Sequence, residues 1–139
     1  MSLPPPSEFY KRFRNAPEAA KKQAFELGQE MGRMLVKEFN IKGNDVKSIA
    51  AVLNALVGRI TVEAPARIED NKVIISNRAF CPIMLSSMSL NLPWLWLCPN
   101  LAWPFMQGAA SVVNPLVRLT VPSWRAKGDP VCDHVFEVK

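Results

Sequence analysis

The sequence lacks the motifs of several common protein classes. It contains no glycine-rich phosphate loop, no pair of carboxylates placed for acid–base catalysis and no Ser-His-Asp arrangement. Its three cysteines form no close CxxC pair, and lysine and arginine never run beyond two in a row. These absences argue against a nucleotide-binding loop, a zinc finger and a basic stripe for nucleic acid. We therefore expect no nucleic-acid partner.

Charge is absent from one long internal stretch, because no charged side chain lies between Arg78 and Arg118. The stretch is interrupted by prolines at positions 82, 93, 99, 104 and 115. No proline-free apolar run in it approaches the roughly 20 residues that a membrane-spanning helix needs. We therefore predict no transmembrane segment but short helices broken by proline, the last running from Asn100 to about Val113.

Large apolar side chains are concentrated in the same uncharged stretch. Too many rings gather here for a connecting loop, so we expect them in the core and in the wall of a ligand pocket. A subunit interface is the second alternative and a membrane surface the third. The predicted ligand-binding residues are Trp94, Trp96, Trp103, Phe105 and Met106.

Length and composition indicate one domain. The chain has 139 residues, 49% of them hydrophobic, which is enough to form a core without disulfide staples. We assign residues 1–16 to a flexible lead-in and a short helix, and residues 17–139 to a single small-molecule-binding domain. The net charge of +5 is typical of a solvated surface. An odd number of cysteines without a signal peptide predicts a cytoplasmic protein.

Two helices are predicted in the N-terminal half. Apolar residues recur at three and four positions from Pro17 to about Phe39, and a nearly all-round apolar helix follows from Val46 to Val57. Gly43 separates the two helices, and Asn44 or Asp45 can cap the second. Gly28 and Gly32, four residues apart in the first helix, predict that another element packs closely against it.

Four strands complete the expected fold. Alternating apolar residues predict a hairpin from strands 59–64 and 72–78, and a second hairpin from strands 116–122 and 131–138. The sequence thus predicts an α+β fold, in which N-terminal helices pack on an antiparallel sheet of about four strands. A proline-broken helical segment lies between the two hairpins.

The three thiols and the single imidazole are the candidate metal ligands. A tetrahedral Cys3His zinc site requires four ligands, and the chain has the matching set in Cys81, Cys98, Cys132 and His134. An iron–sulfur cluster is the alternative cofactor. Their spacing along the chain does not by itself indicate a metal site, so the fold would have to bring them together. Buried, inert thiols and a reactive Cys132 nucleophile remain open alternatives.

The last hairpin carries a family resemblance. The loop from Arg125 to Cys132, RAKGDPVC, followed by an aromatic-bearing strand, resembles the C-terminal signature of 4-vinyl-reductase-type domains, which bind hydrocarbons and other small molecules. A similar ending occurs in the L-2-amino-thiazoline-4-carboxylic acid hydrolase family. The order of elements extends the resemblance over residues 17–138. The chain departs from the first family at Ser123 and Trp124, where a further cysteine is common, and in its tryptophan-rich middle.

Three functional hypotheses follow from these features. The first is a cytoplasmic binding or sensor domain whose apolar, tryptophan-lined pocket holds a small hydrophobic ligand. The second, implied by the hydrolase resemblance, is an enzyme acting on a small cyclic substrate with carbon–nitrogen or carbon–sulfur bonds, through Cys132 or a metal-bound water. The third is a dimerising scaffold that buries residues 81–115 against a second copy.

Overall fold

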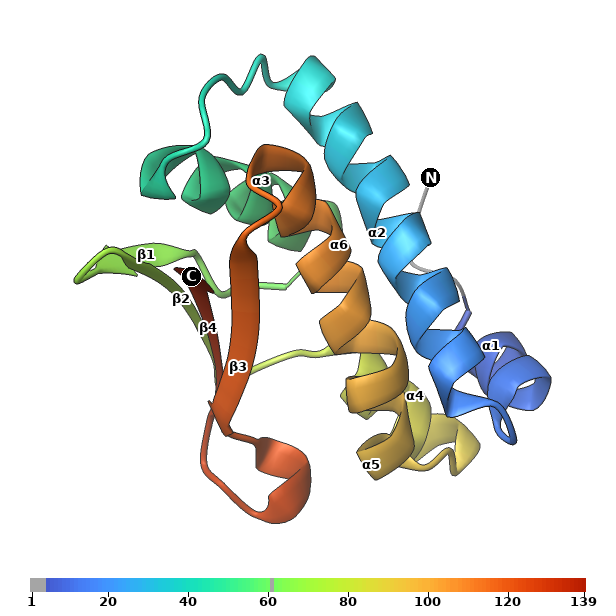
Figure 1. The fold of residues 1–139 in the computed structure, drawn as a ribbon. Coiled ribbons are helices and arrows are strands. Elements are labelled where there is room, and N and C mark those ends of the chain that lie inside the picture. The colour runs from blue at the N-terminus through green and yellow to red at the C-terminus, as the bar shows by residue number, and fades with distance from the viewer. Residues whose placement is uncertain (1–4, 61) are drawn as a thin grey trace.

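The computed structural model describes residues 5–60 and 62–139. Within them the chain forms the predicted α+β fold, with helices covering one face of an antiparallel sheet (Figure 1). The helices are α1 (Pro6–Phe13), α2 (Pro17–Glu38), α3 (Val46–Arg59), α4 (Pro82–Leu90), α5 (Trp94–Leu97) and α6 (Trp103–Val113). The strands are β1 (Arg67–Glu69), β2 (Lys72–Asn77), β3 (Val117–Ser123) and β4 (Cys132–Val138).

The sheet of the described residues has the order β1-β2-β4-β3, with antiparallel neighbours throughout. The C-terminal strand β4 is therefore central. Its pairing with β2 places His134 opposite Ile75 and Cys132 opposite Asn77. These pairs lie at the end of the sheet where β2 leads toward α4, which positions them for the site described below.

The first predicted strand is wrong. Residue 61 lies outside the described residues, and the described part of 59–64 forms no strand: α3 continues to Arg59, and the Val62 N–H donates to the Val57 carbonyl. The strand that pairs with β2 is instead Arg67–Glu69, and Asp70 and Asn71 both adopt positive φ in the two-residue turn between them. A two-residue turn of that kind fixes the register, so the pairing strand must end directly before it.

The Gly28 and Gly32 pair marks a close helix crossing, as predicted. A Cβ atom added at Gly28 would collide with the backbone of Phe105, and one at Gly32 would lie 2.8 Å from the Ala109 carbonyl oxygen. Gly108 on α6 likewise faces the backbone of Phe25 on α2. The two helices therefore cross with their backbones in contact, and α6 lies between α2 and the sheet (Figure 1).

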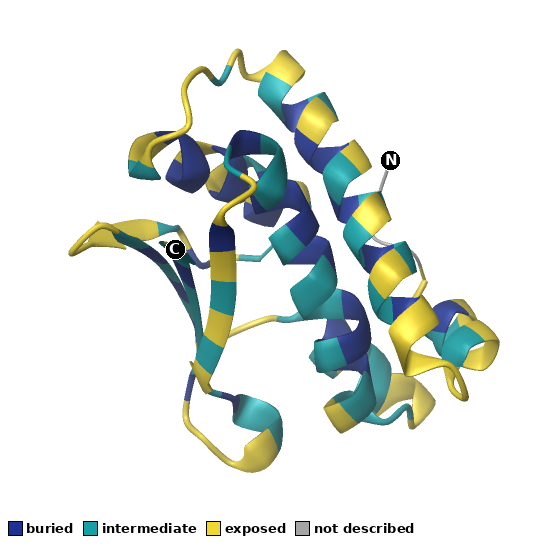
Figure 2. Ribbon diagram, viewed as in Figure 1, coloured by how far each residue is buried: buried dark blue, intermediate teal, exposed yellow. Residues whose placement is uncertain are grey.

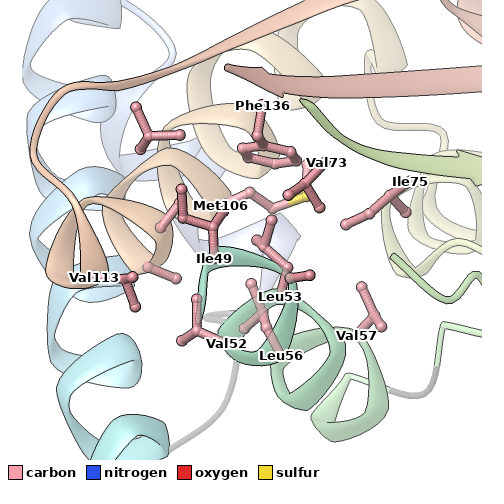
Figure 3. Close-up of a cluster of buried hydrophobic side chains, with 14 of the residues drawn as sticks. Ile49, Val52, Leu53, Leu56, Val57, Val73, Ile75, Met106, Val113 and Phe136 are labelled. Carbon is pink, nitrogen blue, oxygen red and sulfur yellow. The ribbon is translucent and has the colours of Figure 1, made fainter. Parts of the chain in front are cut away.

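The hydrophobic core has two parts. The first lies between α3, α6 and the sheet, where residues such as Leu53, Ile75 and Phe136 are fully buried (Figure 3). The second lies under α1, α4 and α5 and includes Phe9 and Leu97. Buried and exposed residues alternate along α2, as expected of a helix with one face in the core (Figure 2). Part of the predicted lead-in, residues 1–4, lies outside the described residues.

The uncharged stretch forms α4, α5, a π-helical turn called η1 (Cys98–Ala102), and α6. The last helix thus begins at Trp103, three residues later than predicted, because a wider turn precedes it. Of the helices that the structure describes, none is long and apolar enough to cross a membrane.

Candidate ligand cavity

An apolar cavity of about 70 Å³ lies where the two parts of the core meet. It is bounded by β2 and β4 on one side, by η1 and α6 on another, and by the start of α4. All three thiols and the imidazole line it. The other lining residues are Val57, Ile60, Val62, Ile75, Asn77, Pro82, Ile83, Trp94, Ala102, Trp103, Phe105, Met106 and Trp124.

The π-helical turn η1 shapes one wall of the cavity. The Trp103 N–H donates to the carbonyl of Cys98, five residues back, and the Asn100 side chain donates to the Trp96 carbonyl at 2.9 Å. Pro104 has no N–H, so it cannot continue a regular α-helical ladder at this point. The wider turn lets Cys98, Ala102 and Trp103 all face the cavity. Turns of this kind occur frequently at functional sites.

The last hairpin places Trp124 in the opposite wall. Gly128 adopts a φ of 99°, and a carboxylate oxygen of Asp129 accepts the backbone N–H of Trp124 at 2.8 Å. Trp124 is only 9% exposed and its ring contacts the Trp103 ring edge-on, with centroids 4.8 Å apart. The loop therefore folds one indole inward over the cavity.

Two polar side chains contact the segment at the start of α4 and connect it to the other walls of the cavity. The Arg125 guanidinium donates to the Ala79 carbonyl at 2.7 Å and to the Met84 sulfur at 3.3 Å. Asn77 is buried, donates to the Phe80 carbonyl and accepts the Ala79 N–H, both at 3.0 Å. These contacts tie the hairpin loop and β2 to α4, and so position Cys81 on the cavity wall.

Two hydrogen-bond donors in the cavity wall have no acceptor. The indole nitrogens of Trp94 and Trp124 are fully buried, and neither finds a hydrogen-bond partner among the described residues. A buried donor without a partner costs roughly 1–3 kcal/mol. Two such donors beside one cavity are uncommon in a folded protein.

Two thiols of the cavity, those of Cys98 and Cys132, are held in the protonated form. Burial raises the pKa of Cys98 from 9.0 to about 12, and the nearby thiols of Cys81 and Cys132 act in the same direction. The indoles of Trp124 and Trp94 offset part of this rise, although neither N–H reaches hydrogen-bonding geometry. Burial also raises the pKa of Cys132, whose sulfur accepts the Arg125 N–H at 3.3 Å. Neither thiol is activated as a nucleophile.

Alkylation should reveal this protection. In the native protein we expect iodoacetamide at mildly alkaline pH to modify Cys98 more than about 100-fold more slowly than in the urea-unfolded chain, because a buried thiol with a raised pKa holds little thiolate. Peptide mass spectrometry over a time course measures each cysteine separately. Equal rates for Cys98 in the native and unfolded chains would contradict the burial described here.

His134 is a neutral side chain in this site. Burial lowers the pKa of its imidazole from the ordinary 6.5, while contact with the Ile75 carbonyl offsets part of that fall. The Nδ1 atom lies 3.4 Å from the Ile75 carbonyl oxygen. Because a carbonyl only accepts, this contact requires the proton on Nδ1. The Nε2 atom is then an acceptor.

The lowered pKa of His134 predicts an acid-sensitive stability. As the pH falls below 6.5, the unfolded chain takes up a proton at His134 before the folded chain does, so folding stability decreases until the lower pKa of the folded state is passed. The decrease has a limiting slope of about 1.4 kcal/mol per pH unit. Urea unfolding between about pH 5 and pH 7 measures it. His134→Gln, which retains a donor for Ile75, should flatten the profile, and an unchanged profile in that variant would contradict the assignment.

The predicted metal site is wrong. Within residues 5–60 and 62–139, no group of three or more histidine, cysteine, aspartate or glutamate side chains is arranged to hold a metal ion. Cys81, Cys98, Cys132 and His134 share the wall of one cavity, but they do not converge on a point, and His134 Nδ1 and Cys132 Sγ already have backbone partners. The chain is therefore not assigned as a zinc-binding protein. The iron–sulfur alternative stays a prediction.

The predicted ligand-binding residues divide between two places. Trp94, Trp103, Phe105 and Met106 line the cavity, whereas Trp96 packs against the rings of Tyr10 and Phe9, with centroids 5.1 and 6.3 Å away. Sequence reasoning missed other lining residues, above all Trp124, Asn77, Ala102 and Ile83. The sequence did offer one signal for Trp124, because the chain departs from the family signature at this position.

No protein-family model matches this chain, and no curated protein matches it. The resemblance to 4-vinyl-reductase-type domains and to the aminothiazoline-carboxylate hydrolases therefore stays a prediction. Its basis is the loop from Arg125 to Cys132 together with the order of elements. The functional proposal below rests on the geometry of the cavity.

Proposed function

We propose that the chain is a binding or sensor domain for a small, largely apolar molecule held in the cavity between η1, α6 and the sheet. The observation that carries this proposal is the pair of buried, unpartnered indole N–H groups in an otherwise apolar wall. Without an occupant those donors are a cost to folding. A bound molecule that supplies an acceptor removes the cost. The resemblance to hydrocarbon-binding domains is consistent with this proposal.

The size of the cavity limits the occupant. At about 70 Å³ it far exceeds the ~10–15 Å³ that one water requires, and it is about half of the ~150 Å³ of an engineered cavity that binds benzene. A molecule with a handful of non-hydrogen atoms therefore matches the cavity. A larger ligand would enter only if the start of α4 shifted, which requires the contacts of Arg125 with Ala79 and Met84 to break.

The wall also defines the ligand's chemistry. The lining residues that the structure describes include no aspartate, glutamate, lysine or arginine, the thiols of Cys98 and Cys132 are protonated, and His134 is neutral. An ionised ligand would have no countercharge in this wall, and its desolvation would be unfavourable. The site therefore favours a neutral ligand with an apolar body and one acceptor directed toward Trp94 and Trp124.

Calorimetric titration with two matched probes tests the proposal. Cyclopentanone and cyclopentane share a ring, but only the ketone offers an acceptor. We expect cyclopentanone to bind in roughly the millimolar range, a modest efficiency for so small a ligand. Cyclopentane should bind roughly 100-fold more weakly, because it leaves both indoles unpaired and each hydrogen bond contributes roughly tenfold. Absence of binding by both, or equal affinity for the two, would contradict the proposed site.

Ala102→Leu provides the matched control. Its side chain would extend into the cavity from η1 and should abolish binding of cyclopentanone. Ala55→Leu, on α3 outside the cavity, should leave binding unchanged. Thermal unfolding of each variant verifies that it is folded.

The other two functional hypotheses receive less support from the site. A hydrolase acting through Cys132 would need an activated thiolate, whereas burial raises the pKa of that thiol. A hydrolase acting through a metal-bound water would need the metal site that the described residues do not form. The dimerising scaffold and the cytoplasmic location stay predictions, and the first of them is an outcome of the experiment described next.

A further inference from the structure

A cluster of exposed apolar side chains lies outside the cavity, on α4 and α5. Leu85, Met88, Leu90 and Leu95 are each more than half exposed, and Met88 reaches 75%. Only Ile83 of the nine residues of α4 is buried. Single exposed apolar residues need no explanation, but a group on two consecutive short helices marks an interaction surface.

The elements of this cluster gather at one end of the molecule. In Figure 1, α1, α4, α5 and the hairpin loop lie at the lower end, far from the connection between α2 and α3. The contacts agree with the picture, because α4 packs on α1 and α5, and α5 packs on the 3₁₀ turn of the loop, η2 (Arg125–Lys127). We call this surface the α4 end.

The charges around the α4 end are mostly positive. No acidic residue lies between Asp70 and Asp129 in the sequence. The Arg125 guanidinium contacts Met84 of α4, exposed Arg78 precedes the helix, and Lys127 lies over the Trp124 ring on the same loop. Helix α1, packed on α4, adds its own cations, with Glu8 as its single acid.

We propose that the α4 end docks on the surface of an anionic lipid bilayer. Exposed leucine and methionine side chains enter the boundary between headgroups and acyl chains, while arginine and lysine beside them attract lipid phosphates and carboxylates. Charge decides between this partner and a second copy of the chain. A symmetric dimer through the α4 end would bring the positive charges of the two copies close to each other. An anionic bilayer would neutralise these charges instead. This proposal does not depend on the occupant of the cavity.

Vesicle flotation of the full chain tests the proposal. We expect the protein to float with phosphatidylcholine vesicles that contain phosphatidylserine, and to float poorly with phosphatidylcholine alone. Met88→Asp, which places a carboxylate on the most exposed apolar position, should weaken the apparent vesicle affinity roughly tenfold or more. Arg78→Glu should weaken binding to the anionic vesicles, and added salt should do the same.

Matched variants on other surfaces keep the test specific. Leu116, 53% exposed before β3, matches Leu90, 58% exposed on α4. Leu116→Asp should leave vesicle binding unchanged, while Leu90→Asp should reduce it. Failure to float with anionic vesicles, equal loss in the two leucine variants, or equal binding to uncharged vesicles would each overturn the proposal. Light scattering that shows a dimer lost in Met88→Asp, without vesicle binding by the parent chain, would assign the α4 end to a second copy instead.

Discussion

Gly28→Ala is expected to lower the free energy of unfolding by about 2 kcal/mol or more. The added methyl group would meet the backbone of Phe105 on α6, which cannot turn away as a side chain can, so α2 and α6 must separate along their crossing. The loss outweighs the gain of about 1 kcal/mol that alanine brings to a helix interior. Gly108→Ala, which meets the backbone of Phe25 from the other helix, should have an effect of the same sign and size.

Gly58→Ala is the control, because it should raise the free energy of unfolding instead of lowering it. Gly58 lies in the last turn of α3, and an added Cβ there meets nothing within 4 Å. The substitution should therefore stabilise the protein by up to about 1 kcal/mol through helix propensity alone. Urea unfolding of the three variants measures all these changes. A neutral Gly28→Ala would show that the helices do not cross at backbone contact.

Trp124→Phe is expected to weaken the binding of cyclopentanone while leaving the free energy of unfolding nearly unchanged. The substitution removes a buried N–H without a partner, which offsets much of the packing lost against Trp103, so the unfolding free energy should change by less than about 1 kcal/mol. Affinity for cyclopentanone should fall roughly tenfold, the value of one hydrogen bond, while affinity for cyclopentane should stay within about twofold. Calorimetric titration of both probes measures the difference.

Trp96→Phe is the matched control for that experiment. Trp96 belongs to the neighbouring α5 helix but packs against Tyr10 and Phe9 instead of facing the cavity. The variant should bind both probes as the parent chain does, although it loses packing and stability. If Trp96→Phe weakened cyclopentanone binding as much as Trp124→Phe, the ligand would not be held where we propose.

Local signals in the sequence predicted much of the fold. Glycines four residues apart predicted the close crossing of α2, and Asp45 was one of the two residues predicted to cap α3. The partner in the crossing could not be predicted, because helix periodicity indicates a buried face but not what covers it. The first strand was misplaced because the apolar alternation after Gly58 begins in the end of α3, where Arg59 is still helical and the Ile60 N–H donates to the Leu56 carbonyl.

The candidate site was only partly predictable, for a geometric reason. The sequence indicated that thiols, an imidazole and tryptophans are available, and the fold does place most of them around one cavity. Metal coordination depends on the distances between the ligand atoms. Sequence spacing does not predict these distances for ligands on β4, η1 and α4. Trp124 was missed because it stands beside Arg125 and Lys127 in a loop that reads as surface, and only the hairpin's fold turns its indole inward.

The indole resonances of the four tryptophans test the central claim most directly. In a ¹⁵N-labelled sample, with assignments from single Trp→Phe variants, titration with cyclopentanone should shift the Nε1–H signals of Trp94 and Trp124 downfield as they acquire an acceptor. The Trp96 signal should stay in place, and cyclopentane should produce no such downfield shift. Unchanged Trp94 and Trp124 signals at cyclopentanone concentrations well above the expected Kd, or a shift confined to Trp96, would contradict a ligand site built on those two unpaired donors.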